Sequence, residues 1–212
     1  LDKETATAIT STFIEAVIAP DADDEARAVF ATKKNLRLVL ADCSGADRRL
    51  TREVRSILGA VLVQEYDRVD EATAPWSAET AGDDPGFRVV TDRATTEKEW
   101  AALRLAWRVT AHVKSNAVVF SKTDRLAAIG AGQMSRVDAV KVATMKAGTA
   151  LHDSVAASDA FFPFRDGLDA VAAAGATAVV QPGGSVRDEE VIAAANEYGI
   201  AMVFTGRRHF RH

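Results

Sequence analysis

Residues 167–204 read GLDAVAAAGATAVVQPGGSVRDEEVIAAANEYGIAMVF, and this stretch decides the fold class. Two alanine-rich segments, 167–174 and 187–197, have the composition of helices. Each is followed by a short apolar run, at 177–180 and at 200–204, that is typical of a buried strand. Helices that alternate with apolar strands pack in layers around a sheet. The sequence therefore predicts an α/β fold.

The same alternation continues toward the amino terminus. Two apolar runs separated by the polar residues 121–125 predict a hairpin. Thr95 or Thr96 is a candidate N-cap for the helix before it. Strands are expected at 16–19, 36–40, 60–63, 87–90, 116–120 and 126–129, and helices over 4–15, over 22–34, from 95 or 96 to 113, and after Gly132.

An acidic segment interrupts this pattern at 66–86. It is punctuated by proline and glycine, which predicts a solvated connection between two lobes. We place the lobe boundary in this segment. Residues 1–80 then form a first lobe with its linker, and residues 81–212 form a second lobe.

Composition excludes several classes of protein. With 212 residues, 48% of them hydrophobic, the chain can bury a core and is not disordered. Its net charge of −4 argues against nucleic-acid partners, and no apolar run approaches the roughly 18–20 residues of a membrane helix. The single cysteine, Cys43, cannot complete the P-C-x-x-C part of a zinc deaminase site, and it indicates a reducing, cytoplasmic location.

Three motifs occur where an apolar strand gives way to a helix, which is the edge of an open α/β sheet where ligands usually bind. The first is IGAGQMSR at 129–136. Its two glycines allow a tight turn close to a ligand, and Arg136 could present its guanidinium to a phosphate or a carboxylate. The alternative is an ordinary strand-to-helix turn with a surface arginine.

The second motif is QPGGSVRD at 181–188. Ser185 and Asp188 have the spacing of a helix cap, and the free N–H groups of a first helical turn favour a bound anion. The alternative is a cap that only satisfies its own helix.

The third motif is SDAFFPFRDG at 158–167. Its three phenylalanines, arranged around Pro163, could line a slot for a flat heterocycle, with Asp166 as an acceptor. The alternative is three core residues and a helix-capping aspartate.

Two shorter stretches complete the candidates. Lys114-Ser115-Asn116 lies between a helix and a strand, where the amide could orient a reacting group or merely end the helix. The terminal Arg208-His209-Phe210-Arg211-His212 could be a frayed tail. Because it directly follows a predicted buried strand, it could instead be held at the sheet edge.

Taken together and in this order, these motifs resemble the transformylase part of the AICAR transformylase/IMP cyclohydrolase family. The resemblance covers the whole chain. It rests on residues 114–116, 130–136, 158–166 and 208–212, with further similarity at 15–20 and 33–37.

The resemblance implies an enzyme of purine (IMP) biosynthesis. The expected reaction transfers a formyl group from 10-formyltetrahydrofolate to the 5-amino group of AICAR. The expected fold has two cytidine-deaminase-like lobes, each a three-layer αβα arrangement without zinc. The family also implies a homodimer with its active sites at the interface, toward which Trp100 and Trp107 could face, and a possible K⁺ ion near Ser115 and Asp159.

Residue roles follow from the matched motifs. Asn116 is expected to donate a hydrogen bond to the formyl oxygen, and His212 to relay a proton. The AICAR-binding residues are expected to be Asn116, Arg136, Phe161, Arg208 and Phe210, and the folate-binding residues Val137, Asp166, Ser185 and Val186.

In the family, the principal catalytic Lys-His pair and the cyclohydrolase domain lie upstream of the matched region. We therefore expect this chain to be a carboxyl-terminal portion with part of the first lobe and all of the second, and to be nearly inactive alone. Two other interpretations stay open. One is a non-catalytic nucleotide- or folate-binding α/β module, and the other is a structural scaffold.

Overall fold

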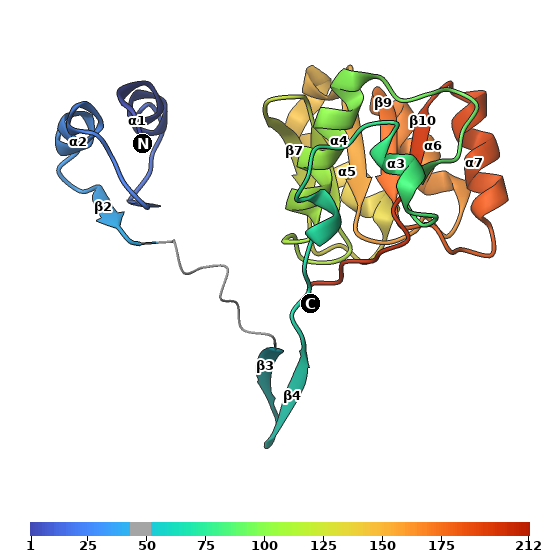
Figure 1. Cartoon of the computed structure of the whole chain (residues 1–212), viewed down its shortest axis with the longest axis horizontal. Helices are drawn as coiled ribbons and strands as arrows, with labels where there is room; N and C mark the ends of the chain where they lie inside the picture. The colour runs from blue at the N-terminus through green and yellow to red at the C-terminus, as the bar shows by residue number, and fades with distance from the viewer. Residues whose placement is uncertain (43–51) are drawn as a thin grey trace. The chain divides into compact units, whose positions relative to one another are not determined.

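The computed structural model describes residues 1–42 and 52–212, and Figure 1 shows the course of the chain. Two compact units divide the chain, Leu1–Tyr66 and Asp67–His212, and each is described by itself. This division falls before the predicted boundary after residue 80, because residues that follow Tyr66 pack into the core of the second unit. Cys43 lies outside the described residues.

The first unit contains a small α/β motif. Helices α1 (Lys3–Thr10) and α2 (Asp24–Ala31) begin at aspartate caps, and they bury Ala6, Ala26 and Phe30. Strands β1 (Ala16–Ala19) and β2 (Arg37–Leu40) pair in parallel, as expected when a helix connects two strands. The unit also holds an antiparallel hairpin of β3 (Arg52–Ile57) and β4 (Ala60–Glu65), of which the sequence analysis predicted only the second strand.

The second unit is built on a six-stranded mixed sheet with the order β5-β10-β9-β8-β6-β7. Its elements in chain order are η1 (Asp70–Ala72), α3 (Thr80–Asp83), β5 (Arg88–Val89), α4 (Glu97–Thr110), β6 (Val118–Ser121), β7 (Leu126–Gly130), α5 (Arg136–Ala147), η2 (Gly148–Leu151), β8 (Ser154–Ser158), α6 (Arg165–Ala173), β9 (Ala176–Gln181), α7 (Asp188–Glu197) and β10 (Ala201–Phe204). The predicted hairpin is confirmed, since β6 and β7 pair antiparallel.

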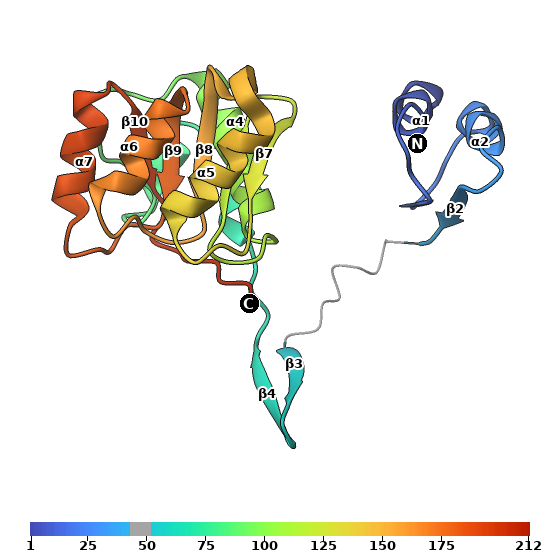
Figure 2. The ribbon, with the colours of Figure 1, turned by 180° about the vertical axis from the view of Figure 1, so that it is seen from behind.

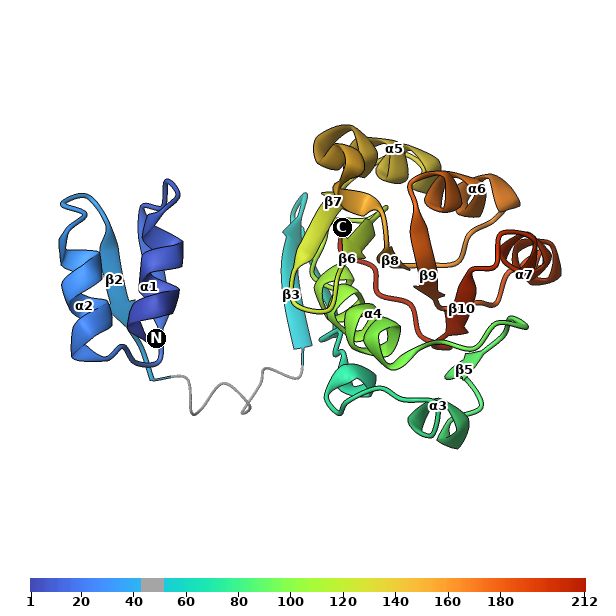
Figure 3. The same ribbon diagram turned by 90° about the horizontal axis from the view of Figure 1, so that it is seen from above.

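Helices cover both faces of this sheet. Figure 2 shows α5, α6 and α7 on one face, and Figure 3 shows α4 on the other. On the first face, β-strand residues such as Phe120 and Met202 pack against apolar residues of the three helices. On the second face, Trp100, Leu103 and Trp107 of α4 are buried on the sheet. The α/β prediction is therefore confirmed.

The acidic segment 66–86 is not a solvated connection, and that prediction was wrong. Ala72, Trp76 and Ala81 are buried in the core on the α4 side of the sheet. The Trp76 ring lies 4.7 Å from that of Phe87, and its Nε1 donates to the Glu71 carbonyl at 2.7 Å. A few large apolar side chains outweigh the acidic composition because each buried tryptophan removes much apolar area from water.

Candidate functional site

Strand direction brings the predicted motifs to one edge of the six-stranded sheet. Strands β8, β9 and β10 are parallel, and β6 runs antiparallel to both β7 and β8. The carboxyl ends of β7, β8, β9 and β10 therefore share an edge with the start of β6. Because β5 is antiparallel to β10, with Arg88 opposite Phe204, the start of β5 lies there as well. This edge is where α/β proteins commonly bind ligands.

At the start of β6, hydrogen bonds join two of the predicted motifs. The Gly132 N–H donates to the Lys114 carbonyl at 2.7 Å, and the Asn116 side-chain amide donates to the Gln133 carbonyl at 2.9 Å. The second bond fixes the Asn116 amide while using only one of its two N–H hydrogens. Asn116 is thus held in place at the sheet edge and can still donate to a ligand.

Arg136 begins α5 and points to the end of β8 rather than to solvent. Its Nη2 lies 3.0 Å from a carboxylate oxygen of the fully buried Asp159, and its Nε donates to the Ser158 hydroxyl and the Ala160 carbonyl. The Ser115 hydroxyl donates to the other oxygen of Asp159. The positive charge of Arg136 therefore balances a buried carboxylate and orders the loop after β8.

These contacts bear on the predicted K⁺ ion. Arg136 and Ser115 take one oxygen each of the Asp159 carboxylate. Each of these oxygens keeps a further lone pair, so a K⁺ ion near Ser115 and Asp159 stays a prediction. Among residues 1–42 and 52–212, no group of three or more His, Cys, Asp or Glu side chains is placed to hold a metal ion.

The three phenylalanines after β8 separate into different environments. Phe162 is fully buried, and its N–H donates to the side-chain oxygen of buried Gln181 at 2.9 Å. Phe161 is half-buried, with the Arg208 guanidinium 5.9 Å from its ring centre. Phe164 is exposed, with Arg187 4.8 Å from its ring centre. The structure thus favours the core alternative for Phe162 and leaves Phe161 for a flat ligand.

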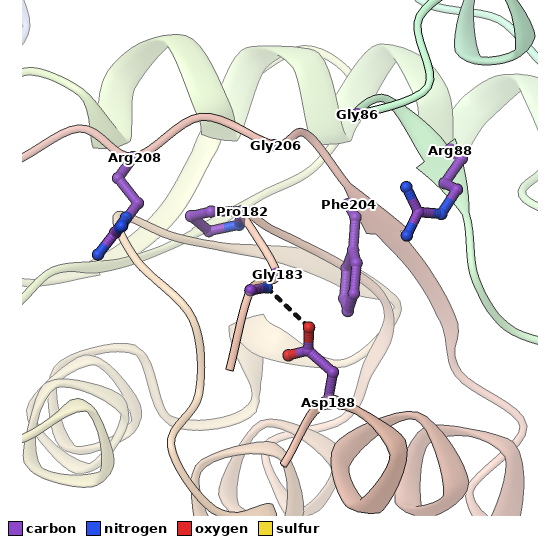
Figure 4. Close-up of a pocket in the computed structure, with 9 residues that line it drawn as sticks. Gly86, Arg88, Pro182, Gly183, Asp188, Phe204, Gly206 and Arg208 are labelled. Carbon is purple, nitrogen blue, oxygen red and sulfur yellow. Dashed lines mark hydrogen bonds between the residues drawn. The ribbon is translucent and has the colours of Figure 1, made fainter. Parts of the chain in front are cut away.

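A pocket of about 330 Å³ opens beside β10, and its volume is within the range of small-ligand sites. In Figure 4, Arg208 and Arg88 stand on opposite sides of the pocket, with Phe204 between them. Gly183 has φ +71°, and a Cβ there would lie 2.4 Å from the Phe204 ring, so only glycine lets this loop pass so closely. The lining residues are Gly86, Arg88, Pro182, Gly183, Gly184, Asp188, Phe204, Gly206 and Arg208.

The loop after β9 satisfies its own N–H groups. The Asp188 carboxylate accepts from Gly184 N–H at 2.7 Å and from Ser185 N–H at 3.2 Å, and the Ser185 hydroxyl accepts from Arg187 N–H. These side chains bond N–H groups that precede α7, and the N-cap residue Arg187 makes no side-chain capping bond to the helix. Val186 is fully exposed, and the first turn of α7 is acidic, which disfavours an anion at its N–H groups.

The carboxyl-terminal tail is held at the sheet edge. The His209 N–H donates to the Asp159 carbonyl at 3.1 Å, and the Ser115 N–H donates to the Arg211 carbonyl at 2.8 Å. The rings of Phe210 and His212 stack 5.7 Å apart, and Phe210 is 45% exposed. Arg208 and Phe210 are thereby carried to the edge where the other motifs lie.

His209 is the buried residue of this tail. Its Nδ1 lies 2.9 Å from an Asp67 carboxylate oxygen, and its Nε2 lies 2.8 Å from a Glu71 carboxylate oxygen. Burial lowers the pKa of His209, but the bonds to Glu71 and Asp67 outweigh it and raise that pKa. Burial raises the pKa of Glu71, yet the bonds from His209 and Trp107 outweigh it and lower that pKa.

The sequence-predicted residues therefore occupy neighbouring loops of one edge. Asn116, Arg136, Phe161 and Arg208 make the contacts described above, and Val137 is half-buried in the first turn of α5. Asp166 accepts from the Gly167 N–H within the first turn of α6, whose N-cap residue is Phe164. Sequence reasoning gave no role to Arg88, Gln181 or the partners of His209, because the contacts that matter, Arg88 with Phe204, Gln181 with Phe162 and His209 with Asp67 and Glu71, join different segments of the chain. No helix in the described ranges has the length and apolarity needed to cross a bilayer.

Known proteins match this chain over most or all of its length. Residues 1–146 match the family model described as AICARFT/IMPCHase bienzyme. The bifunctional purine biosynthesis protein PurH of Myxococcus xanthus is 52% identical over 216 residues, covering 100% of this chain and 40% of that protein. PurH of Chloroflexus aurantiacus is 54% identical over 98% of this chain and 39% of its own length. The chain thus spans about 40% of the length of these curated relatives.

Proposed function

This chain belongs to the AICARFT/IMPCHase bienzyme family, and from this premise we propose that it supplies substrate-binding residues for a formyltransferase of purine (IMP) biosynthesis. The reaction transfers the formyl group of 10-formyltetrahydrofolate to the 5-amino group of AICAR. IMP cyclohydrolase activity belongs to the same proposal for the whole protein, because the chain spans only part of its relatives.

One observation carries the proposal. The tail places the Arg208 guanidinium 5.9 Å from the ring centre of Phe161, at the same edge as Asn116 and the glycine-lined pocket. An arginine beside an aromatic face suits a flat base that carries a phosphate, since the guanidinium binds the phosphate oxygens and the ring packs on the base. Arg136 stays assigned to AICAR in this proposal, and it also holds the Asp159 loop on which Phe161 is carried.

The formyl transfer requires catalytic assistance at two substrate atoms, the amine nitrogen and the formyl oxygen. The 5-amino group of AICAR is conjugated with a carboxamide, so it is a weak nucleophile that must lose a proton as it attacks. The formyl oxygen gains negative charge in the same step and needs a donor. We assign the donor to Asn116, which Gln133 holds in place, and the proton relay to His212, which stacks on Phe210.

The folate side of the site is assigned to loops that surround the same edge. Val137 and Asp166 lie in the first turns of α5 and α6, and exposed Val186 offers an apolar surface. Ser185 is assigned to the glutamate tail of the folate. Since Asp188 already accepts the nearby N–H groups, this contact would use the Ser185 hydroxyl and not a free helix end.

The larger assembly is part of the same proposal. We propose cytidine-deaminase-like lobes, a homodimer with shared active sites and a cytoplasmic location. Trp100 and Trp107 are buried under α4, so they do not face a partner and the sequence-based hint from them was wrong. What supports a dimer is the hairpin β3–β4, in which Val54, Val61 and Val63 are exposed.

Substitution of Arg208 tests the function through the phosphate. We expect Arg208→Ala to weaken AICAR binding about 10- to 100-fold in calorimetry, because one charge-assisted contact is lost. The riboside of AICAR, which has no phosphate, should bind Arg208→Ala and the unaltered protein equally. Arg125→Ala, an exposed arginine in the β6–β7 turn, is the matched control and should bind like the unaltered protein. Equal losses for AICAR and its riboside would contradict the role of Arg208. No binding of AICAR to the unaltered protein would contradict the function.

A further inference from the structure

We propose that His209 is a positioning residue, whose imidazole is clamped between Asp67 and Glu71 so that its neighbour Arg208 is presented to the ligand. The inference rests on the proposed function, to which it adds a residue that never touches substrate. His209 is 2% exposed, so its own side chain does not reach the site.

The clamp engages both nitrogens of the ring. Nδ1 lies 2.9 and 3.0 Å from the two Asp67 oxygens, and Nε2 lies 2.8 Å from Glu71. A neutral imidazole has a single N–H, whereas two carboxylates as partners require both nitrogens to donate. The ring is therefore held as a cation between two anions. These bonds fix the orientation of the imidazole relative to the tail backbone and how deeply the ring is buried.

Other contacts keep the clamp rigid. The Trp107 Nε1 donates to Glu71 at 2.6 Å, and the Trp107 ring meets the imidazole edge-on at 5.1 Å. Arg207 adds a second cation 3.4 Å from the other Glu71 oxygen. The tail is thus fastened to α4 and to the segment that holds η1, with no ligand involved.

Backbone hydrogen bonds on either side of the His209 side chain fix the direction in which the neighbouring side chain points. Hydrogen bonds from His209 to Asp159 and from Ser115 to Arg211 lay the tail across the end of β8 and the start of β6. The imidazole of His209 points toward Trp107, and the guanidinium of its neighbour Arg208 points toward Phe161. An apolar side chain in place of His209 could pack on Trp107, but it could not fix the rotation of the tail.

The test uses variants that keep the packing. In the protein at its full natural length, we expect His209→Leu to raise the KM for AICAR about tenfold while changing the KM for 10-formyltetrahydrofolate and kcat by less, as loss of a ground-state contact does. Glu71→Ala should raise the KM for AICAR by a similar factor. Glu71→Gln, which keeps an acceptor for Trp107 and His209, should recover most of the loss. His112→Gln, an exposed histidine just after α4, is the control.

A double variant separates positioning from general damage. If His209 acts through Arg208, then adding His209→Leu to Arg208→Ala should weaken AICAR binding no further than Arg208→Ala alone. Affinity for the riboside should be unchanged in both. Additive losses, or an equal loss for the riboside, would overturn the proposal.

Hydrogen exchange gives a readout that needs no ligand. The N–H groups of His209 and Ser115 should lose protection in His209→Leu, and protection of the β8 and β9 strands should persist. Retained protection of the tail would refute the clamp even if AICAR binding failed throughout. Failure of the unaltered protein to bind AICAR would instead count against the proposed function, while loss of tail protection would still support the clamp.

Discussion

At the scale of single residues, close packing decides which side chains the site can tolerate. The phenylalanines of the third motif illustrate the limit of sequence reasoning. The core alternative holds for Phe162, while Phe161 stays half-buried and its role in a slot for a flat ligand stays a prediction. The spacing could not separate them, since the choice depends on Gln181, a residue on another strand that binds the Phe162 N–H.

Gly130, at the end of β7, offers a test of packing at this edge. A Cβ at Gly130 would lie 1.8 Å from the Ala139 carbonyl oxygen of α5, so Gly130→Ala must push the strand and the helix apart. We expect it to lower the free energy of unfolding by about 3 kcal/mol or more. Gly82→Ala is the control, because its Cβ would meet nothing within 4 Å. Equal urea midpoints for the two variants would show that β7 and α5 are not so tightly joined.

At the scale of elements, the predictions succeeded where the pattern is local. The start of α4 was expected at Thr95 or Thr96, and Thr96 forms a capping box with Glu99. Strand β8 was missed although it lies inside the sheet, because its sequence SVAAS has small residues and a single β-branched one. It is a strand because β6 and β9 flank it and all its residues are buried, and neither fact is visible locally.

Glu99 makes the stability of the second unit sensitive to acid. Burial raises its pKa, but the bonds from Arg93, Thr96 and Thr177 outweigh it and lower the pKa from 4.5 to about 2. A lowered pKa adds stability above pH 4.5 that is lost as the pH falls toward 2.

In Glu99→Gln, we therefore expect a loss of about 2–3 kcal/mol in the free energy of unfolding at pH 7, with the difference from the unaltered protein shrinking between about pH 4.5 and 2. Glu97→Gln, an exposed position in the same first helical turn, should show little of either effect. Urea denaturation at several pH values measures both. A pH-independent difference would mean that the Glu99 charge is not the cause.

At the scale of the whole molecule, the meeting of distant motifs was predictable in outline. The rule that ligands bind at the carboxyl ends of strands placed the three motifs at one edge, and the topology does so. What the sequence could not show is the path of the tail. The bonds of His209 to Asp67 and Glu71 close loops of 142 and 138 residues, and no pattern of residue types specifies such a pairing.

The last prediction concerns the proposed homodimer and the hairpin β3–β4. Val54 lies opposite Val63, and Ser56 lies opposite Val61, so the three valines share one exposed face of the hairpin. A two-stranded hairpin by itself is only marginally stable in water, so we expect another protein surface to bury this apolar face. If a second copy supplies it, Val63→Lys should shift the protein toward half the mass in light scattering. Gln64→Lys, at the next residue on the opposite face, should leave the mass unchanged. A dimer that survives Val63→Lys would place the interface elsewhere.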